Sequence, residues 1–430
     1  METKTLQPAP RMAGTLSVPG DKSISHRAVI LGSLSNRPCQ VDNFLDADDC
    51  MRTVDAFRQM GVSIDRQETS LKIIGRGLDR LHAPAAPINC GNSGTTTRLL
   101  MGVLTGQPFE VHLFGDDSLS NRPMDRVIEP LAKMGAFFMP GPKPGRLPLR
   151  MHGTRDVRAL HWKSPVASAQ VKSAILLAGL YASGATQVDE PSLSRDHTER
   201  MLQASGVVIE RRGTSVIVRG TATVRATQFM VPGDLSSAAF MLGAGLLRGV
   251  GEMMVKSIGV NPTRTGFVEV IKAMGATVRM ASMTTVGGEP VADIGVRLSP
   301  LRGTAIQGDL VARAIDEIPI LTVLATQAQG ETVLSDAKEL RVKESDRLAA
   351  LREELTKMGA RIRENPDGLV VQGPTPLRGA IVRSHGDHRL AMSLAVAALV
   401  ADGPTTIEDV ECVSTSFPSF WQRLESVRVA

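Results

Sequence analysis

The sequence predicts an α/β protein of two domains, each made of three copies of one small module. Two different phrases recur along the chain at a spacing of roughly 70 residues, which suits a small α/β module better than a solenoid unit. A proline-glycine phrase that occurs twice indicates where the chain passes between the domains. The length of 430 residues agrees with this division, because a single hydrophobic core stops growing at about 250–300 residues.

The first recurring phrase joins the end of a helical stretch directly to a strand. Glycine just past a helix adopts the left-handed turn at little cost, and the β-branched residues that follow it favour a strand. The phrase occurs as RQMGVSI, AKMGAFF, QASGVVI, KAMGATV and TKMGARI, around Gly61, Gly135, Gly206, Gly275 and Gly359.

The second phrase places a small polar turn between a helix end and an alternating strand. Modules of roughly 70 residues would fill the chain with six copies, and six copies of this phrase occur. A single copy is an accident of composition, but the common spacing of both phrases indicates an internal repeat. The copies read LSNRPCQVDNF, LTGQPFEVHLF, ASGATQVDEP, LRGVGEMMVKS, AQGETVLSD and ADGPTTIEDV.

The predicted passages between the domains lie at two related phrases. VPGDKS at residues 18–23 is echoed by VPGDLS at residues 231–236, and Pro-Gly pairs commonly mark turns. We expect one domain to comprise residues 21–232 and the other to comprise residues 1–20 and 233–430.

The charge and the aromatic content of the chain limit the kinds of molecule that it is expected to bind. A net charge of +5 fits either an ordinary solvated surface or the binding of anionic small molecules. Proteins that bind single-stranded nucleic acid stack bases on aromatic side chains. Only 3% of the residues are aromatic, so we expect no nucleic-acid partner. No apolar run reaches the length of a membrane span, so we expect no membrane partner.

The cysteines and the N-terminal residues indicate a cytoplasmic protein. Cys39, Cys50, Cys90 and Cys412 lack the spacing of zinc ligands or of a redox C-x-x-C motif. We therefore expect thiols in a reducing compartment. The first residues, METKTLQPAP, lack the apolar core of a signal peptide.

Polar and basic residues precede several apolar stretches that we expect to form helices. Backbone N–H groups and the helix dipole favour anions at a helix start. The segment GDKSISHRA places Lys22, Ser23 and Arg27 at such a start. It is not a P-loop, because the required upstream glycine is missing. An ordinary capped helix with a surface lysine would show the same pattern.

Further candidates follow in the first half of the chain. Gly94, in GNSGTTTR, would let the backbone approach an anion closely. Arg122, in SNRPM, could bind a carboxylate or phosphate with two hydrogen bonds. SAQVK places Ser168 and Gln170 at the start of an apolar helix, and Arg195 follows in RDHTE. Helix capping and surface ion pairs also account for these clusters.

The second half of the chain adds two carboxylates and three cations. Asp316, in IDEIP, precedes an apolar stretch and could simply complement a helix dipole. The segment RVKESDR contains Glu344. If this segment is helical, Lys343 and Arg347 lie one turn apart, and a bound anion would resolve the repulsion between their charges. Arg389 lies in HGDHR, whose His-x-Asp-His order finds no matching metal ligands elsewhere, so we expect no metal. Cations in both halves suit two highly anionic substrates held between two domains.

These motifs resemble, in order, those of the 3-phosphoshikimate 1-carboxyvinyltransferases, or EPSP synthases. The match extends from Pro19 to Pro418. GDKS, SAQVK, RDHTE and NPTR are similar to the class II branch of that family. The matching motifs are GDKSISHRA, GNSGTTTR, SNRPMDR, SAQVK, RDHTE, NPTR, IDEIP, RVKESDR and GDHRLAM.

The resemblance implies a fold and a reaction. The fold would be the two-domain enolpyruvyl transferase fold, an inside-out α/β barrel with three βαβαββ-type units in each domain and the active site in the cleft between them. The enzyme would transfer the enolpyruvyl group of phosphoenolpyruvate to the 5-hydroxyl of 3-phosphoshikimate, in the shikimate pathway of aromatic amino acid biosynthesis. Phosphate leaves by C–O cleavage, and neither a cofactor nor a metal is implied. We expect a cytoplasmic monomer whose partners are these two substrates.

The resemblance also implies roles for residues that match the family's motifs. Asp316 resembles the residue that handles the proton of the attacking hydroxyl, and Glu344 resembles the acid near the methylene carbon. Lys22 is the third implied catalytic residue. The implied contacts of 3-phosphoshikimate are Lys22, Ser23, Arg27, Ser168, Arg195, Asp316 and Lys343. The implied contacts of phosphoenolpyruvate are Lys22, Gly94, Arg122, Gln170, Arg347 and Arg389.

Three positions bear on variation within the family. Ala169 stands where class I members have a second serine, and Thr415 stands where many members carry a lysine. A C-terminal cation contact is therefore not implied. The inhibitor glyphosate occupies the phosphoenolpyruvate site in this family. Class II resemblance suggests tolerance, yet Gly94 leaves open the space that a methyl group fills in the most tolerant members.

Two alternatives remain at this stage. The related UDP-N-acetylglucosamine 1-carboxyvinyltransferases typically have a loop cysteine shortly before an Arg-Pro, where this chain has Asp117 and Ser118. SISHR and RDHTE favour the shikimate enzyme. A non-catalytic anion- or RNA-binding protein is an alternative of another class, and it leaves Asp316 and Glu344 unexplained.

Overall fold

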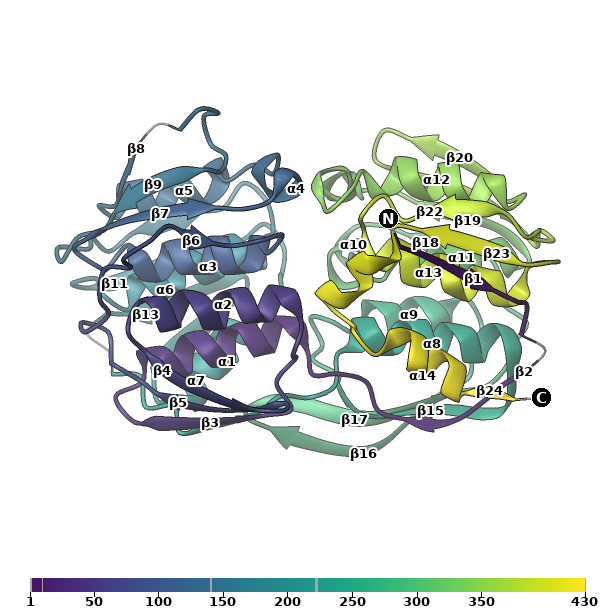
Figure 1. The fold of residues 1–430 in the computed structure, drawn as a ribbon, viewed down its shortest axis with the longest axis horizontal. Helices are drawn as coiled ribbons and strands as arrows, with labels where there is room; N and C mark the ends of the chain where they lie inside the picture. Colours follow the sequence, from purple (N-terminus) through teal and green to yellow (C-terminus); the bar gives the residue numbers. More distant parts are fainter. Residues whose placement is uncertain (1, 10, 140, 221–222, 430) are drawn as a thin grey trace. The chain divides into compact units, whose positions relative to one another are not determined.

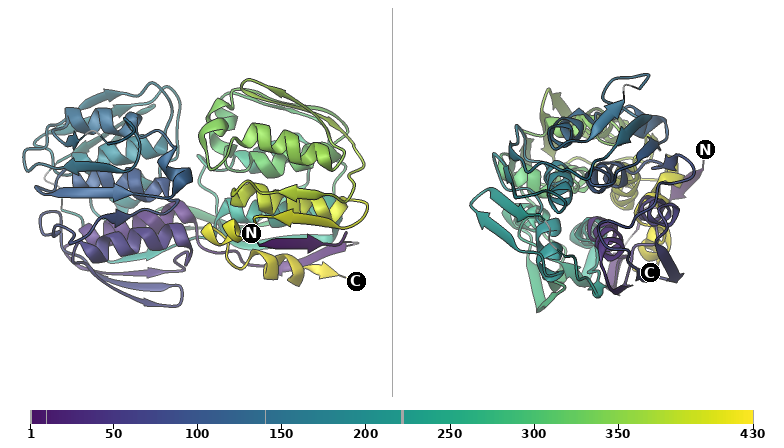
Figure 2. Two further views of the ribbon diagram at one scale, coloured as in Figure 1. Left: turned by 45° about the horizontal axis from the view of Figure 1, so that its top comes forward. Right: turned by 90° about the vertical axis from the view of Figure 1, so that its left-hand side faces the viewer.

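The structure, a computed structural model, describes residues 2–9, 11–139, 141–220 and 223–429. The strands in these ranges form six sheets (Figures 1 and 2). No helix in the same ranges is long and apolar enough to cross a membrane.

Contacts along the chain define two compact units, which we call the central unit and the terminal unit. The terminal unit contains both ends of the chain. The central unit also includes a short segment from the second half, which lies at the tip of a hairpin. The central unit comprises Gly20–Val231 and Val286–Glu289, and the terminal unit comprises Met1–Pro19, Pro232–Thr285 and Pro290–Ala430.

Three four-stranded sheets of the central unit share one pairing pattern within the described residues. Their strand orders are β14-β3-β5-β4, β6-β7-β9-β8 and β10-β11-β13-β12. The first two strands of each order are parallel, and the other pairs are antiparallel. The strands are β3 Pro38–Asp42, β4 Ser63–Gln67, β5 Ser70–Ile74, β6 Ile88–Asn89, β7 Glu110–Phe114, β8 Phe137–Met139, β9 Leu149–His152, β10 His161–Lys163, β11 Ala185–Asp189, β12 Ile209–Arg212, β13 Ser215–Arg219 and β14 Gln228–Met230. The helices are α1 Lys22–Leu34, α2 Asp48–Gln59, α3 Gly94–Leu104, α4 Asp117–Ser120, α5 Asp125–Lys133, α6 Ala169–Gly179 and α7 His197–Ala204.

The sheets of the terminal unit follow the same plan with added or missing edge strands. Their orders are β16-β17-β15-β2-β24, β18-β19-β21-β20 and β1-β23-β22. The strands are β1 Thr3–Leu6, β2 Arg11–Leu16, β15 Gly249–Gly259, β16 Val278–Val286, β17 Glu289–Val296, β18 Ala305–Ile306, β19 Gly330–Leu334, β20 Arg361–Asn365, β21 Gly368–Gly373, β22 Ile381–Arg383, β23 Thr405–Glu408 and β24 Arg428–Val429. The helices are α8 Leu235–Arg248, α9 Gly266–Ala273, α10 Asp309–Ala314, α11 Ile318–Gln327, α12 Arg347–Lys357, α13 His388–Val400 and α14 Phe420–Ser426, with 3₁₀ turns at Lys338–Val342 and Val410–Thr415.

The predicted repeat is confirmed at the five copies of the first phrase and at the six copies of the second. Each glycine of the first phrase has a positive φ, between 83° and 112°, at the end of a helix. The six copies of the second phrase contain β3, β7, β11, β15, β19 and β23, which are the strands that carry the parallel pairing in each sheet.

The predicted βαβαββ order is continuous in the chain for three sheets only. These begin at β6, β10 and β18. In the other three sheets a strand comes from a distant part of the chain: β14 pairs with β3, β2 with β15, and β1 with β23. β14 and β2 take the place of the first, parallel strand, whereas β1 pairs antiparallel with β23 and takes the place of a later strand.

Helices form the centre of each unit, and the sheets lie around them (Figure 2). α1, α3 and α6 in the central unit, and α8, α11 and α13 in the terminal unit, are buried along nearly their whole lengths. A helix that is apolar on all sides is stable only inside a protein. Close packing demands small residues, since a Cβ added at Gly102 of α3 would lie 2.4 Å from the carbonyl oxygen of Ala174 in α6. The predicted inside-out arrangement is confirmed.

Side chains cap the starts of most of these buried helices. Asp21, Ser93 and Ser168 accept backbone hydrogen bonds at α1, α3 and α6. Asp234 and Asp387 do the same at α8 and α13. The apolar helices therefore begin with fixed polar residues, and the predicted site residues lie beside these caps.

Candidate active site

The start of α1 carries the first candidate residues of the central unit. Lys22 is the first residue of α1, and its ammonium pairs with the buried carboxylate of Asp49. His26, one turn on, is buried and contacts Thr53 through Nδ1 at 2.7 Å. Burial keeps the pKa of His26 well below its usual value, and the charges of Lys22 and Arg27 lower it further. The imidazole is therefore neutral, which leaves Lys22 and Arg27 as the cations of this helix start.

Arg27 is buried and is held by three hydrogen bonds. Its Nε donates to Thr198 Oγ1 at 2.6 Å, Nη2 donates to Ser173 Oγ at 2.8 Å, and Nη1 donates to the carbonyl of Ser23 at 2.9 Å. Burial lowers the pKa of Arg27 to about 10, against an opposing effect of Glu199. The guanidinium remains charged at neutral pH, and its position is fixed by α6 and α7.

The starts of α3 and α6 lie close together. Gln170 donates through Nε2 to Thr95 Oγ1 at 3.1 Å and accepts from Nη1 of Arg98 at 2.5 Å. A Cβ added at Gly94 would lie 2.9 Å from Arg98 Nη1 and 3.5 Å from Arg122 Nη1. Gly94, Arg122 and Gln170 thus form one group around Arg98, a residue to which the sequence assigned no role.

Arg122 is positioned by the loop before α3. Its Nη2 donates to the side-chain carbonyl of Asn92, and its Nη1 donates to the backbone carbonyl of Asn92 at 3.4 Å. Only 8% of Arg122 is exposed. The polar residues before α3 therefore orient this arginine.

Lys172, Glu190 and Glu199 form a buried ion triad next to Ser168. The Lys172 ammonium lies 2.7 Å from Glu190 and 2.9 Å from Glu199, and all three side chains are at most 1% exposed. Burial alone would lower the pKa of Lys172, but the charges of Glu199 and Glu190 outweigh it and raise that pKa. Glu190 also accepts from the N–H of Ser168 at 3.2 Å.

The same triad reaches the loop that carries Arg195. Glu190 accepts from the hydroxyl of Ser194 at 2.6 Å, and Lys172 donates to the carbonyl of Ser194 at 3.4 Å. Arg195, which follows Ser194, is half-buried. The triad therefore holds both the residue at the start of α6, Ser168, and the loop residue that precedes Arg195.

In the terminal unit, Arg347 is the most buried of the predicted cations. Its Nε lies 2.7 Å from Asp387 Oδ2, and its Nη2 lies 2.6 Å from Glu344 Oε2. Burial alone would lower the pKa of Arg347, but the charges of Asp387 and Glu344 raise it above its usual value. Asp387 also caps α13. The aspartate of the His-x-Asp-His segment therefore binds an arginine and caps a helix.

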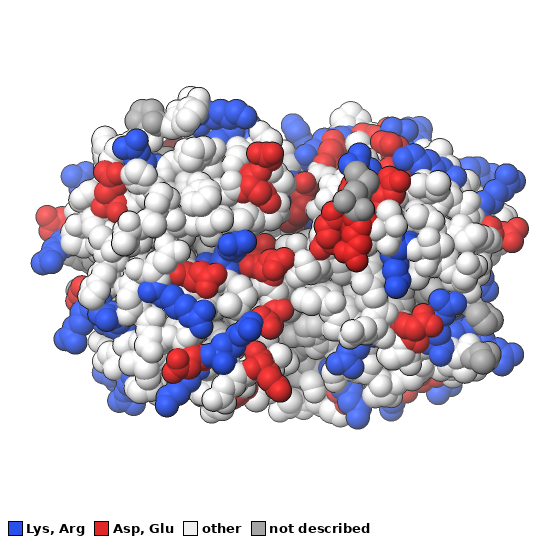
Figure 3. Space-filling model, in the orientation of Figure 1, with Lys and Arg blue, Asp and Glu red and all other residues white. Residues whose placement is uncertain are grey.

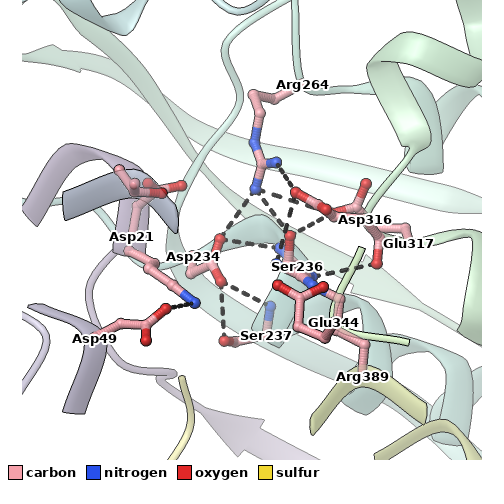
Figure 4. A network of polar contacts seen from close by, with 12 residues as sticks. Asp21, Asp49, Asp234, Ser236, Ser237, Arg264, Asp316, Glu317, Glu344 and Arg389 are labelled. Atoms are coloured by element: carbon pink, nitrogen blue, oxygen red, sulfur yellow. Dashed lines mark hydrogen bonds and ion pairs between the residues drawn. The ribbon is translucent and has the colours of Figure 1, made fainter. Parts of the chain in front are cut away.

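Asp316 lies among three guanidinium groups, as Figure 4 shows in part. Its Oδ1 is 3.6 Å from Arg347 Nη1, and its Oδ2 is 3.6 Å from Arg389 Nη2. Oδ2 is also 3.5 Å from Nη1 of Arg264. The Asp316 side chain is 13% exposed. Its carboxylate is thus surrounded by positive charge yet remains accessible.

Lys343 and Glu344 lie just before α12, beside Arg347. Desolvation lowers the pKa of Lys343, although the charge of Asp316 opposes this shift. The Glu344 side chain is 18% exposed and pairs with Arg347. Asp316, Lys343, Glu344, Arg347 and Arg389 therefore form one cluster in the terminal unit.

The structure brings the predicted residues together in two groups, one in each unit. Sequence reasoning left the supporting residues without roles, namely Asp49, Arg98, Lys172, Glu190, Glu199, Arg264 and Asp387. Five of these residues lie inside motifs that the sequence analysis quotes, and this was the signal that could have identified them. They are Arg98 in GNSGTTTR, Lys172 in SAQVK, Glu199 in RDHTE, Arg264 in NPTR and Asp387 in GDHRLAM.

One trio in the described ranges has ligand atoms close enough together to hold a metal ion. It consists of Glu353, Glu354 and His385. The ammonium of Lys357 already lies 2.9 Å from both oxygens of Glu354, and His385 Nε2 lies 2.6 Å from Glu354 Oε1. The carboxylate of Glu354 is therefore already paired with a lysine and in contact with a histidine.

Comparison with known proteins gives consistent matches over the whole chain. A family model described as EPSP synthase (3-phosphoshikimate 1-carboxyvinyltransferase) matches residues 6–424. The chain is 48% identical over 425 residues to a 3-phosphoshikimate 1-carboxyvinyltransferase from Desulforamulus reducens, covering 99% of each chain. It is 50% identical over 426 residues to a protein of the same name from Gloeobacter violaceus, covering 99% of this chain and 98% of the relative.

Solved structures agree with these matches. EPSP synthase from Acinetobacter baumannii is similar with a TM-score of 0.89 and 41% identity, covering 100% of this chain and 99% of that chain. The enolpyruvyl transferase NikO from Streptomyces tendae has a TM-score of 0.79 at 17% identity, covering 98% of this chain and 96% of that chain. The second likeness concerns the fold alone.

The buried triad generates a stability prediction. Lys172→Met leaves Glu190 and Glu199 as neighbouring buried carboxylates without their cation. We expect a loss of about 3–5 kcal/mol in the free energy of unfolding, because breaking a buried ion pair strands a charge. Thermal and urea unfolding followed by circular dichroism would measure it.

Two further variants serve as controls for this prediction. Lys133→Met removes the exposed pair with Glu129 and the contact of the ammonium with the Trp162 ring in the same unit. We expect the free energy of unfolding to fall by at most about 2 kcal/mol. Lys172→Met combined with Glu190→Gln and Glu199→Gln should recover much of the loss, because no buried charge is stranded. Equal stability of Lys172→Met and Lys133→Met would contradict the structural role given to the triad.

Proposed function

The chain belongs to the EPSP synthase (3-phosphoshikimate 1-carboxyvinyltransferase) family, and from this premise we propose how its residues share the reaction. The enzyme transfers the carboxyvinyl group of phosphoenolpyruvate to the 5-hydroxyl of 3-phosphoshikimate and releases phosphate. This reaction belongs to the shikimate pathway of aromatic amino acid biosynthesis. The observation that carries the assignment is the family match over residues 6–424. The UDP-N-acetylglucosamine reaction is the less supported alternative.

We propose that Asp316 is the general base. The acceptor's 5-hydroxyl must lose its proton as its oxygen adds to C2 of phosphoenolpyruvate, and a positioned carboxylate can take that proton. The ion pairs with Arg264, Arg347 and Arg389 support this role, because neighbouring cations favour the ionised carboxylate. Partial exposure leaves the carboxylate open to a hydroxyl.

We propose that Glu344 supplies the proton that C3 of phosphoenolpyruvate takes up in the addition. An acid must carry a proton, whereas the ion pair with Arg347 favours the charged form of Glu344. Donor phosphate bound to Arg347 would offset that cation and let Glu344 take up a proton. In the second half-reaction C3 returns its proton to Glu344 as the C–O bond to phosphate breaks.

We propose that both units supply cations to the substrates. Lys22, Arg122, Arg347 and Arg389 are the proposed partners of the phosphate and carboxylate of phosphoenolpyruvate, with Gly94 and Gln170 beside them. Fixed cations stabilise charge that develops at the donor oxygens in the transition state. Ser23, Arg27, Ser168, Arg195 and Lys343 are the proposed further contacts of 3-phosphoshikimate.

We also propose a cytoplasmic, monomeric enzyme. All four cysteines are thiols, and burial raises the pKa of Cys39 to about 12. These observations suit a reducing compartment. On the face shown in Figure 3, basic and acidic side chains are intermixed in each unit.

The activity is tested by phosphate release. We expect release only when phosphoenolpyruvate and 3-phosphoshikimate are both present, because phosphate leaves from an adduct of the two. Mass spectrometry should detect 5-enolpyruvylshikimate 3-phosphate. Release with UDP-N-acetylglucosamine in place of 3-phosphoshikimate would instead support the alternative.

The acid–base roles are tested by near-isosteric variants. Asp316→Asn and Glu344→Gln should each lower kcat by about 10²–10⁴-fold, the usual contribution of a general acid or base. Binding of 3-phosphoshikimate, measured by calorimetry, should persist. Glu353→Gln is the matched control, because Glu353 lies on α12 and pairs only with Lys357 in the contacts described. Near-normal turnover in both site variants would refute the assignment.

Glyphosate sensitivity tests the placement of Gly94. A Cβ at this position meets the ends of two guanidinium groups, which can shift. We expect Gly94→Ala to raise the glyphosate inhibition constant more than the KM of phosphoenolpyruvate, because the longer inhibitor meets the methyl group first. Gly243→Ala is a helical control whose added Cβ lies nearest to side-chain atoms of Ile320 and Leu324, and it should change neither constant. Equal changes in both constants for Gly94→Ala would refute the steric explanation.

A further inference from the structure

Arg264 is a buried arginine to which the sequence motifs assign no role, and the proposed mechanism uses it only as one of three cations around Asp316. It lies in a tight turn between β15 and α9. The side chain of Asn261 accepts from the N–H of Thr263 at 3.0 Å and from its hydroxyl at 2.8 Å. The N–H of Arg264 donates to the carbonyl of Asn261 at 2.7 Å. The turn therefore fixes the backbone from which the guanidinium extends.

The guanidinium of Arg264 is anchored at one nitrogen by the start of α8. Nη2 lies 3.1 Å from Asp234 Oδ1 and 2.9 Å from Ser236 Oγ. Asp234 caps α8, and only 3% of the Arg264 side chain is exposed. Arg264 is thus held by the framework of the terminal unit, and its other nitrogen, Nη1, points to Asp316 (Figure 4).

The three cations around Asp316 differ in what they can do when substrates bind. Arg347 and Arg389 are proposed partners of the anionic donor, whose negative charge would offset their effect on Asp316. Arg264 is tied to Asp234 and Ser236 and is not among the proposed contacts of the donor, so the donor's charge does not offset it directly. It is then the cation that still orients the Asp316 carboxylate.

We propose that Arg264 is the positioning residue of the general base. It holds Oδ2 of Asp316, directs Oδ1 toward the acceptor's hydroxyl, and keeps the carboxylate ionised when the donor is bound. This inference rests on the role proposed for Asp316. Arg264 acts through Asp316 and touches no substrate itself.

Other charged groups near Asp316 also affect its ionisation, and the pH profile of kcat reports their combined effect. Arg347 on α12, Arg389 on α13 and Lys343 before α12 favour the ionised carboxylate. Glu317 next in the chain, Asp234 at α8 and Glu344 oppose it. Removing the positive charge of Arg264 should make the ionised form of the Asp316 carboxylate less favourable. A base must be deprotonated to act, so the acid limb of the kcat profile moves to higher pH.

The test compares Arg264→Gln with Arg264→Lys over a range of pH. Arg264→Gln should move the acid limb of kcat up by about one pH unit, at the low end of the effect of an adjacent opposite charge. Arg264→Lys keeps the charge but loses the two-nitrogen bridge between α8 and Asp316. Arg264→Lys should leave the acid limb in place and lower kcat about tenfold, which corresponds to a rise of about 1.4 kcal/mol in the activation barrier. The KM of each substrate should stay near that of the wild type.

Controls separate this role from a purely structural one. Arg313→Gln removes another arginine of the same unit, which pairs with Glu269, and it should leave kcat and the acid limb unchanged. A stable Arg264→Gln enzyme with an unmoved acid limb would overturn the proposal. If Arg264→Gln does not fold, Arg264→Lys decides, and wild-type kcat in that variant would overturn it.

Failure of the role proposed for Arg264 can be distinguished from failure of the role proposed for Asp316. Near-normal turnover of Asp316→Asn would show that Asp316 is not the base. Loss of turnover in Asp316→Asn, together with an unmoved acid limb in Arg264→Gln, would reject the role of Arg264 alone.

Discussion

Six helices that are buried on nearly every side form the centres of the two units, and the open N–H groups of their first turns need acceptors. A buried N–H left unsatisfied costs about 1–3 kcal/mol. Five of the helices meet this demand with a capping side chain, and α11 has Pro319 in its first turn, which carries no N–H. The capping residues are Asp21, Ser93, Ser168, Asp234 and Asp387. Polar residues are thus required at the same helix starts where the candidate substrate contacts lie.

Two of these caps also hold arginines, and this links helix packing to the electrostatics of the site. Asp387 caps α13 and pairs with Arg347, and Asp234 caps α8 and pairs with Arg264. A cation held by a helix cap cannot move without disturbing a buried helix. Charges fixed in advance are what stabilises a charged transition state with little reorganisation.

The sequence predicted those parts of the fold that depend on neighbouring residues. The glycines at helix ends and the six repeated strands depend on local backbone preferences, and both predictions are confirmed. The exchange of edge strands was missed, because β14 reaches β3 only through the topology of the whole unit. The site residues stay a prediction, which the sequence gives as cations and the two carboxylates Asp316 and Glu344 near helix starts. The buried carboxylates that hold the arginines were not predicted, since Asp234 and Arg264 are 30 residues apart and Arg347 and Asp387 are 40 apart.

The hairpin of β16 and β17 has a consequence for how such proteins can exchange segments in evolution. Its strands belong to the terminal unit, while its tip, Val286–Glu289, belongs to the central unit. There Glu289 pairs with the buried His197 at 2.8 Å, and the carbonyl of Gly288 accepts from Arg200. A recombination event that transferred only residues 20–231 would separate His197 from its carboxylate. α7 and the hairpin tip must therefore be inherited together, although 80 or more residues of other structure separate them in the chain.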